Sequence, residues 1–213
     1  MGIIEDKSAF LLIPRMMAAG NKGDIEGYEA AFSLIKELEV YESSIVRDKR
    51  MTVPDHIVYN EENFKKAHEY ASDLRVHVAR AAEGENTERM YKLYRNLLQF
   101  DAPHDFDCFC RFIEWDREPE KRFYQPRRKQ LLPLAQALQR LEERKTHLLC
   151  ISMPPGTGKT TLAEFFLTWT GGKHPDLPNL IGSHSIPSLC PGTPTFQLLS
   201  FLPWESLALR VTE

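Results

Sequence analysis

The segment from Met153 to Thr160 constrains this chain more than any other part of its sequence. It reads Met-Pro-Pro-Gly-Thr-Gly-Lys-Thr. It matches the phosphate-loop pattern G-x-x-x-x-G-K-S/T except at the first position, where Met153 replaces glycine. Gly156 and Gly158 allow the backbone to turn so that successive N–H groups face one anion. The segment therefore predicts a loop that binds phosphate groups.

The side chains at the end of this segment suit a nucleoside triphosphate. Lys159 can reach the β- and γ-phosphates, and the hydroxyl of Thr160 can ligate Mg²⁺. The amides of the helix expected next would stabilise the phosphate charge. We expect ATP and Mg²⁺ as cofactors, with Lys159 as the catalytic residue and Thr160 as the metal ligand. The expected nucleotide contacts in the loop are Pro154, Pro155, Gly156, Thr157, Gly158, Lys159, Thr160 and Thr161.

The sequence on both sides of the loop predicts alternating strands and helices. Residues 147–153 form a short apolar run before two prolines, which is typical of a buried strand. A helix is expected over 158–169, stopped by Gly171 and Gly172, and a second strand over 179–183. Strand, helix and strand in this order form a βαβ unit, which implies a parallel sheet.

Helical periodicity dominates the first hundred residues. Apolar side chains recur at helical spacing over 25–38, 64–78 and 90–97, a pattern that we attribute to core packing. Further helices are expected over 106–113 and from Pro126 to Leu141. The predicted fold class is therefore α/β, with a helical N-terminal region followed by an incomplete P-loop NTPase domain built on a parallel sheet. The predicted domains are residues 1–100, residues 101–185 and an irregular tail at 186–213.

A second feature lies about thirty residues before the loop, between Phe123 and Leu131. This stretch combines aromatic residues, two glutamines and a basic cluster. The amide of Gln125 or Gln130 has both a donor and an acceptor and could read an adenine edge, and the ring of Tyr124 could stack on the base. The alternative is the solvated start of a basic helix.

Composition excludes several classes of protein. The chain has 27 basic and 30 acidic residues among 213, so its net charge of -3 gives no global basic field for nucleic acid. The four cysteines include no Cys-x-x-Cys pair and are expected to be free thiols, and no histidine is assigned to a metal. The apolar run at 10–13 is too short for a membrane span and follows acidic residues, so we expect a cytoplasmic protein with no membrane partner.

Three stretches together resemble the ATPase half of the large terminase subunit of tailed bacteriophages and prophages. They are Phe-Cys-Arg-Phe-Ile at 109–113, Phe-Tyr-Gln-Pro-Arg-Arg-Lys-Gln-Leu at 123–131 and Pro-Pro-Gly-Thr-Gly-Lys-Thr-Thr-Leu-Ala at 154–163. The resemblance covers roughly residues 86–185. It implies a motor in the cytoplasm of the bacterial host that drives DNA into a procapsid with ATP. It also implies a homo-oligomeric ring on a portal protein, together with a small terminase subunit.

The resemblance also assigns roles to individual residues. Gln125 or Gln130 would contact adenine, Lys159 the phosphates and Thr160 the phosphates and Mg²⁺. In some relatives an arginine inside the loop neutralises charge on the transferred phosphate. The loop of this chain contains no arginine, so an arginine for this role must come from elsewhere.

The acidic residues that hydrolysis needs are missing from the expected place. After Thr160 the only acids are Glu164, Asp176, Glu205 and Glu213, and none follows an apolar strand of four residues. The resemblance also implies a separate, metal-dependent C-terminal nuclease domain, and the carboxylates of that domain are missing too. We therefore expect an ATP-binding N-terminal fragment that does not hydrolyse ATP by itself.

The last 28 residues, 186–213, differ in composition from the rest of the chain. They contain four prolines, no lysine and only three charged residues. Relatives tend to continue with Asn-Ser-Phe, whose codons read one nucleotide out of phase can give the Ile-Pro-Ser found at 186–188. We hypothesise a frameshifted prophage gene, and the alternative is an ordinary proline-rich terminus.

Two other classes of function stay open on the sequence. Pro-Pro-Gly-Thr-Gly-Lys-Thr is common in AAA-type ATPases, and the stretch from Gln125 to Gln130 also fits a helicase-like ATPase. The second possibility is a non-enzymatic helical interaction module that carries a relic nucleotide site.

Overall fold

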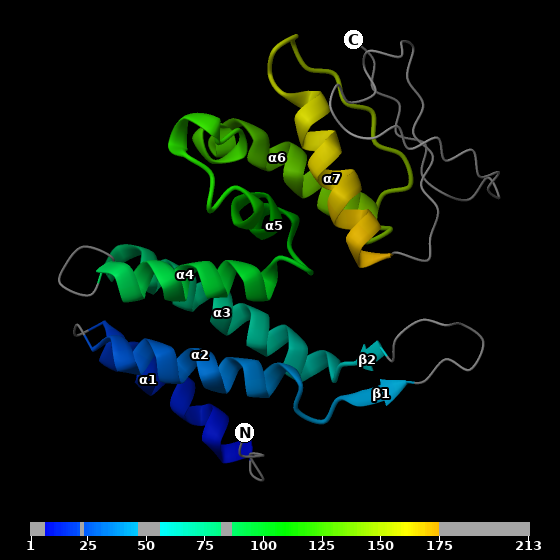
Figure 1. Cartoon of the computed structure of the whole chain (residues 1–213). Helices are drawn as coiled ribbons and strands as arrows, with labels where there is room; N and C mark the ends of the chain where they lie inside the picture. Colours follow the sequence, from blue (N-terminus) through cyan, green and yellow to red (C-terminus); the bar gives the residue numbers. More distant parts are fainter. Residues whose placement is uncertain (1–6, 22–23, 47–55, 82–86, 175–213) are drawn as a thin grey trace. The chain divides into compact units, whose positions relative to one another are not determined.

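Helices make up most of the chain in the computed structural model, which describes residues 7–21, 24–46, 56–81 and 87–174. The chain divides into two units, Met1–Asp101 and Ala102–Glu213 (Figure 1). The irregular tail expected at 186–213 and the second expected strand at 179–183 lie outside the described residues.

The expected α/β fold with a parallel sheet is wrong. The one sheet in the described ranges is antiparallel and has two strands, β1 (Ser44–Val46) and β2 (His56–Val58). Of the strand expected over 147–153, only Ile151 forms a β-bridge, and Leu148 is 63% exposed. An apolar run becomes a strand only where neighbouring backbone pairs with its N–H and C=O groups. No described segment forms a ladder with this run.

The helices expected in the first unit are confirmed, the first ending one residue later than expected and the other two extended by several residues. The unit contains η1 (Lys7–Leu12), α1 (Ile13–Gly20), α2 (Ile25–Glu39), α3 (Glu61–Ala81) and α4 (Thr87–Asp101). Asp24 caps α2, because its side chain accepts a hydrogen bond from the backbone N–H of Glu26. The apolar stripes face one core, whose fully buried members include Tyr28, Ile35, Leu74 and Leu97.

Two glycines let α1 and α2 approach each other closely. A Cβ at Gly20 would lie 2.1 Å from Cδ1 of Tyr28. A Cβ at Gly27 would lie 2.7 Å from the carbonyl oxygen of Met16. The Tyr28 hydroxyl then donates to Oδ1 of Asn21 over 2.7 Å, so the buried ring keeps a polar partner at its tip.

The described part of the second unit is built from three α-helices and a short 3₁₀ turn. They are α5 (Phe106–Ile113), η2 (Pro119–Lys121), α6 (Tyr124–Glu142) and α7 (Lys159–Lys173) (Figure 1). The helices expected at 106–113 and from Pro126 are confirmed, the latter beginning two residues earlier. The expected stop of α7 at Gly171 and Gly172 is wrong. Neither glycine has the positive φ of a left-handed cap, so the helix continues through both.

The core of this second unit joins α5, α6 and α7. Its fully buried members include Phe106, Leu131, Leu138 and Phe166. Trp169 packs into the same cluster, and its Nε1–H donates to the carbonyl oxygen of Ala102 over 2.8 Å. The loop from Met153 to Thr160 therefore leads directly into α7, a helix whose buried side chains pack into this core.

Among the described helices, none combines the length and apolarity that crossing a membrane requires.

Candidate functional site

The loop before α7 has the backbone geometry that its glycines predict. Gly156 has φ +77° and Gly158 has φ +90°, in the left-handed region that side chains with a Cβ rarely adopt. Gly158 is the N-cap of α7. Pro154, Pro155 and Gly156 are exposed, so the turn is open to a ligand.

Two hydrogen bonds close the loop on itself. Nζ of Lys159 donates to the carbonyl oxygen of Met153 over 2.7 Å. The hydroxyl of Thr157 donates to the carbonyl oxygen of Pro154 over 2.8 Å. The side chain of Lys159, which the sequence predicts to bind phosphate, therefore reaches back across the loop to its first residue, Met153.

The first turn of α7 carries a positive field. It contains no acidic residue, and its N-cap Gly158 has no side chain with which to occupy the backbone N–H groups. The free N–H groups and the helix dipole both favour an anion at such an end. Thr160 is exposed and Thr161 half-buried in this turn, so both hydroxyls belong to the same end of the helix.

Phe123 supports the loop from the beginning of α6. A Cβ at Gly158 would lie 2.2 Å from Cε2 of the Phe123 ring. The same ring meets Phe165 of α7 edge to face, with centroids 5.9 Å apart. The guanidinium of Arg127 lies over the Phe123 ring, 5.2 Å from its centroid. The structure thus brings the start of the 123–131 stretch to the loop, through a residue that the sequence analysis did not select.

Glu114 is a second residue that the sequence analysis missed. Its side chain is fully buried, and it accepts hydrogen bonds from the backbone N–H groups of Phe123, Tyr124 and Gln125 at 2.7 to 3.1 Å. The carboxylate therefore caps α6 from a distance of nine to eleven residues. A carboxylate so far from the helix that it caps matches no local capping pattern, so the sequence offers no signal for it.

Two residues expected at adenine are engaged inside the second unit. Tyr124 is fully buried, and its hydroxyl donates to Oδ1 of Asp107 over 2.7 Å. Burial and the negative Asp107 raise the pKa of this phenol. The Gln125 amide accepts from Arg122 and donates to the carbonyl oxygen of Arg111. Gln130 is exposed on α6.

Some of the side chains considered for Mg²⁺ binding and hydrolysis lie among the described residues, and others lie outside them. The Thr160 hydroxyl is exposed in the first turn of α7, where a metal ion on a bound phosphate could reach it. Glu164 is half-buried further along the same helix. The other acids after the loop, Asp176, Glu205 and Glu213, lie outside the described residues.

A separate group at the start of α5 contains three ligand-type side chains, those of Asp105, Asp107 and Cys108. Asp105 caps the helix by accepting the N–H of Cys108 over 2.8 Å. Asp107 forms two hydrogen bonds, at 2.8 and 2.9 Å, with the guanidinium of Arg128. These contacts account for the two carboxylates structurally, so we do not assign this group to a metal.

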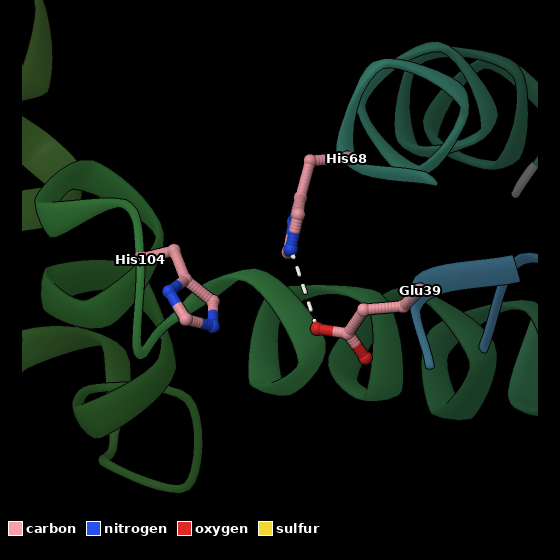
Figure 2. A group of neighbouring side chains, drawn as sticks. All are labelled: Glu39, His68 and His104. Carbon is pink, nitrogen blue, oxygen red and sulfur yellow. Dashed lines mark ion pairs between the residues drawn. The ribbon is translucent and has the colours of Figure 1, made fainter. Parts of the chain in front are cut away.

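A charged cluster also lies in the first unit, around His68 of α3. Its Nδ1 is 2.6 Å from Oδ1 of Asp101. Its Nε2 is 3.4 Å from Oε1 of Glu39, the ion pair that Figure 2 shows. The guanidinium of Arg75 lies 2.6 Å from Oδ2 of Asp101. Burial lowers the pKa of His68, but the hydrogen bonds and charges of Asp101 and Glu39 outweigh this effect and raise it to about 9. The cluster ties α2, α3 and α4 together as a buried ion network.

Comparisons with protein-family models, with curated proteins and with solved structures give no match for this chain. The geometry of the loop and the sequence around it are therefore what supports a function for this chain.

Proposed function

We propose that the loop from Met153 to Thr160 binds the triphosphate of ATP. The observation that carries the proposal is the pair of left-handed glycines, Gly156 and Gly158, directly before an acid-free helix N-terminus. Consecutive amides in such a turn can face one anion, and the helix end adds a positive field. Lys159 would exchange the carbonyl oxygen of Met153 for a phosphate oxygen, because a negatively charged oxygen attracts the ammonium group more strongly than a neutral carbonyl does.

Mg²⁺ belongs to the same proposal through Thr160. Its hydroxyl is exposed in the first turn of α7, next in sequence to Lys159. Thr160 would hold Mg²⁺ through this hydroxyl, and the ion would supply positive charge that the single lysine leaves unbalanced. For adenine, the exposed Gln130 is the freer of the two glutamines considered above.

The proposed biological role follows from the resemblance to terminase large subunits. The chain would be the ATP-binding N-terminal part of such a subunit, working in the host cytoplasm with DNA, a portal protein and a small subunit. No parallel sheet is part of this proposal. We expect no ATP hydrolysis by the chain alone, because Glu164 is the only acid after Thr160 among the described residues and it lies on a helix.

Nucleotide affinity measured by calorimetry on the whole chain tests the proposal. Lys159→Ala should weaken Mg-ATP binding by about tenfold to a hundredfold, since a hydrogen bond to a charged group contributes about 1.5–3 kcal/mol. Lys65→Ala, which removes the same charge from an exposed position on α3, should leave the affinity unchanged. Equal affinities of the wild-type chain and Lys159→Ala would overturn the proposal.

The helical character of the first unit supports a second candidate, a helical interaction module. Five helical segments and one small hairpin form this unit in the described ranges, without any phosphate-type loop. Stimulation of an ATPase by a portal protein or small subunit would favour the terminase role. A chain that binds no nucleotide but still captures a portal protein would favour the module.

A further inference from the structure

The ring of Phe123 occupies the space beside Gly158 that a side chain would otherwise fill. A Cβ at Gly158 would come within 2.2 Å of Cε2 and 2.3 Å of Cζ of this ring. These two atoms form one edge of the ring, so the loop meets the ring at that edge. The ring also contacts Phe165 on the helix that follows the loop. Phe123 thus touches the loop and the helix that the loop begins.

The backbone at Phe123 is itself held by a buried carboxylate. Glu114 is 0% exposed and accepts the N–H of Phe123 over 2.7 Å. Arg122 reinforces the same segment, donating to the carbonyl oxygens of Trp115 and Arg117 at 3.0 and 2.9 Å. Several hydrogen bonds therefore link the segment around Glu114 to the segment around Phe123, and they hold the backbone at Phe123 in place.

We propose that Phe123 is a positioning residue for the phosphate-binding loop, held in place by Glu114, and that it acts on the triphosphate rather than on the base. This inference rests on the function proposed above. It gives Phe123, the first aromatic residue of the 123–131 stretch, a role other than stacking on adenine, for which the sequence favoured its neighbour Tyr124.

The physical reason lies in the conformation of Gly158. With φ +90°, Gly158 sets the direction of the backbone N–H groups in the first turn of α7. A glycine has many other allowed conformations. The Phe123 ring fills the adjacent space and limits that freedom. Without the ring, the loop would have to spend binding energy on ordering itself, and its affinity for phosphate would fall.

The surroundings of the ring argue against a role in stacking on the base. Gly158 meets one edge, Phe165 packs against the ring, and the Arg127 guanidinium lies over it at 5.2 Å. A base that stacked on the ring face beneath Arg127 would have to displace this guanidinium. The contacts to the loop need no such rearrangement.

The test compares Phe123→Ala and Phe123→Leu with wild type, using Mg-ATP and inorganic tripolyphosphate as separate ligands. Phe123→Ala should weaken both ligands by the same factor of about ten, the equivalent of one misaligned charged hydrogen bond. Phe123→Leu should restore most of the affinity by refilling the space. Glu114→Gln, which keeps the shape of the side chain, should produce a smaller loss for both ligands. Phe109→Ala removes a partly buried ring from the same core and should change neither affinity.

Each outcome separates this inference from the function on which it rests. A loss for ATP but not for tripolyphosphate in Phe123→Ala would show base stacking and overturn the inference. Unchanged affinities in Phe123→Ala, together with a loss in Lys159→Ala, would overturn the inference and leave the ATP site standing. Unchanged affinities in both would overturn the proposed function itself. Circular dichroism melts identify a variant that fails to fold, and in that case Phe123→Leu and Glu114→Gln decide by the same criteria.

Discussion

Lys159 donates from Nζ to the carbonyl oxygen of Met153 over 2.7 Å, and this hydrogen bond joins the two ends of the phosphate-type loop. A neutral carbonyl is a weaker partner for an ammonium group than a phosphate oxygen. The bond therefore holds the lysine close to the turn without engaging it irreversibly.

The two glycines of the loop differ in what surrounds them, so they should respond differently to alanine. Both have positive φ, which costs an alanine about 1–2 kcal/mol. A Cβ at Gly158 would also collide with Phe123, whereas a Cβ at Gly156 meets nothing within 4 Å. Gly158→Ala should therefore destabilise the second unit more than Gly156→Ala, as measured by urea unfolding. Equal losses would contradict the close contact with Phe123.

The contact between α1 and α2 predicts a strong effect at Gly20. A Cβ there would lie 2.1 Å from the buried ring of Tyr28, so Gly20→Ala should cost about 1–3 kcal/mol of unfolding free energy. Gly172→Ala provides the matched control, because this helical glycine is exposed and a Cβ meets nothing within 4 Å. It should stabilise α7 by about 0.5–1 kcal/mol. A stabilising Gly20→Ala would show that the two helices are further apart than described.

The His68 cluster predicts a stability that falls at alkaline pH. The pKa of His68 is raised from 6.5 to about 9 in the folded chain, so folding favours the charged imidazole. Its contribution is complete below pH 6.5 and is lost as the pH rises through about 9. Thermal melts between about pH 6 and about pH 10 should show this loss in the first unit. A His68→Gln variant should lose this component of the pH dependence, and an unchanged profile in that variant would contradict the assignment.

The same cluster predicts that Asp101 contributes more than an exposed acid. Its carboxylate has a side chain only 4% exposed and lies 2.6 Å from both His68 and Arg75. Asp101→Ala should cost on the order of 3 kcal/mol, because it leaves two cations partly buried without their shared partner. Glu29→Ala breaks a pair with Arg89 in which both side chains are more than 40% exposed, and should cost less than about 1 kcal/mol. Chemical denaturation of both variants measures the difference.

The sequence predicted the helices well because their apolar spacing is local information. The stripes over 25–38, 64–78 and 90–97 correspond to α2, α3 and α4, and the loop glycines have the conformations that their pattern demands. The prediction of a parallel sheet was wrong because an apolar run indicates that side chains are buried, but not whether the backbone pairs with another strand. Leu149 and Met153 pack against helices of the second unit, whereas Leu148 points to solvent.

The supporting residues of the site could not be predicted for a different reason. Glu114 caps a helix nine to eleven residues away, and Phe123 packs on a glycine thirty-five residues later in the chain. Such contacts depend on how α5, α6 and α7 pack, which single-sequence patterns do not encode. Tyr124, which follows Phe123, was the aromatic residue that the pattern favoured, and the structure places it in the core.

The most direct test of the account follows the backbone amides of Gly156 and Gly158 by ¹H–¹⁵N NMR during titration with Mg-ATP. The account predicts that these two glycine signals shift with saturation, that Lys159→Ala weakens the response, and that adenosine without phosphates leaves both signals in place. Signals that stay fixed up to millimolar Mg-ATP (a weak-binding limit, about −4 kcal/mol), or that respond equally to adenosine, would contradict a phosphate site in this loop.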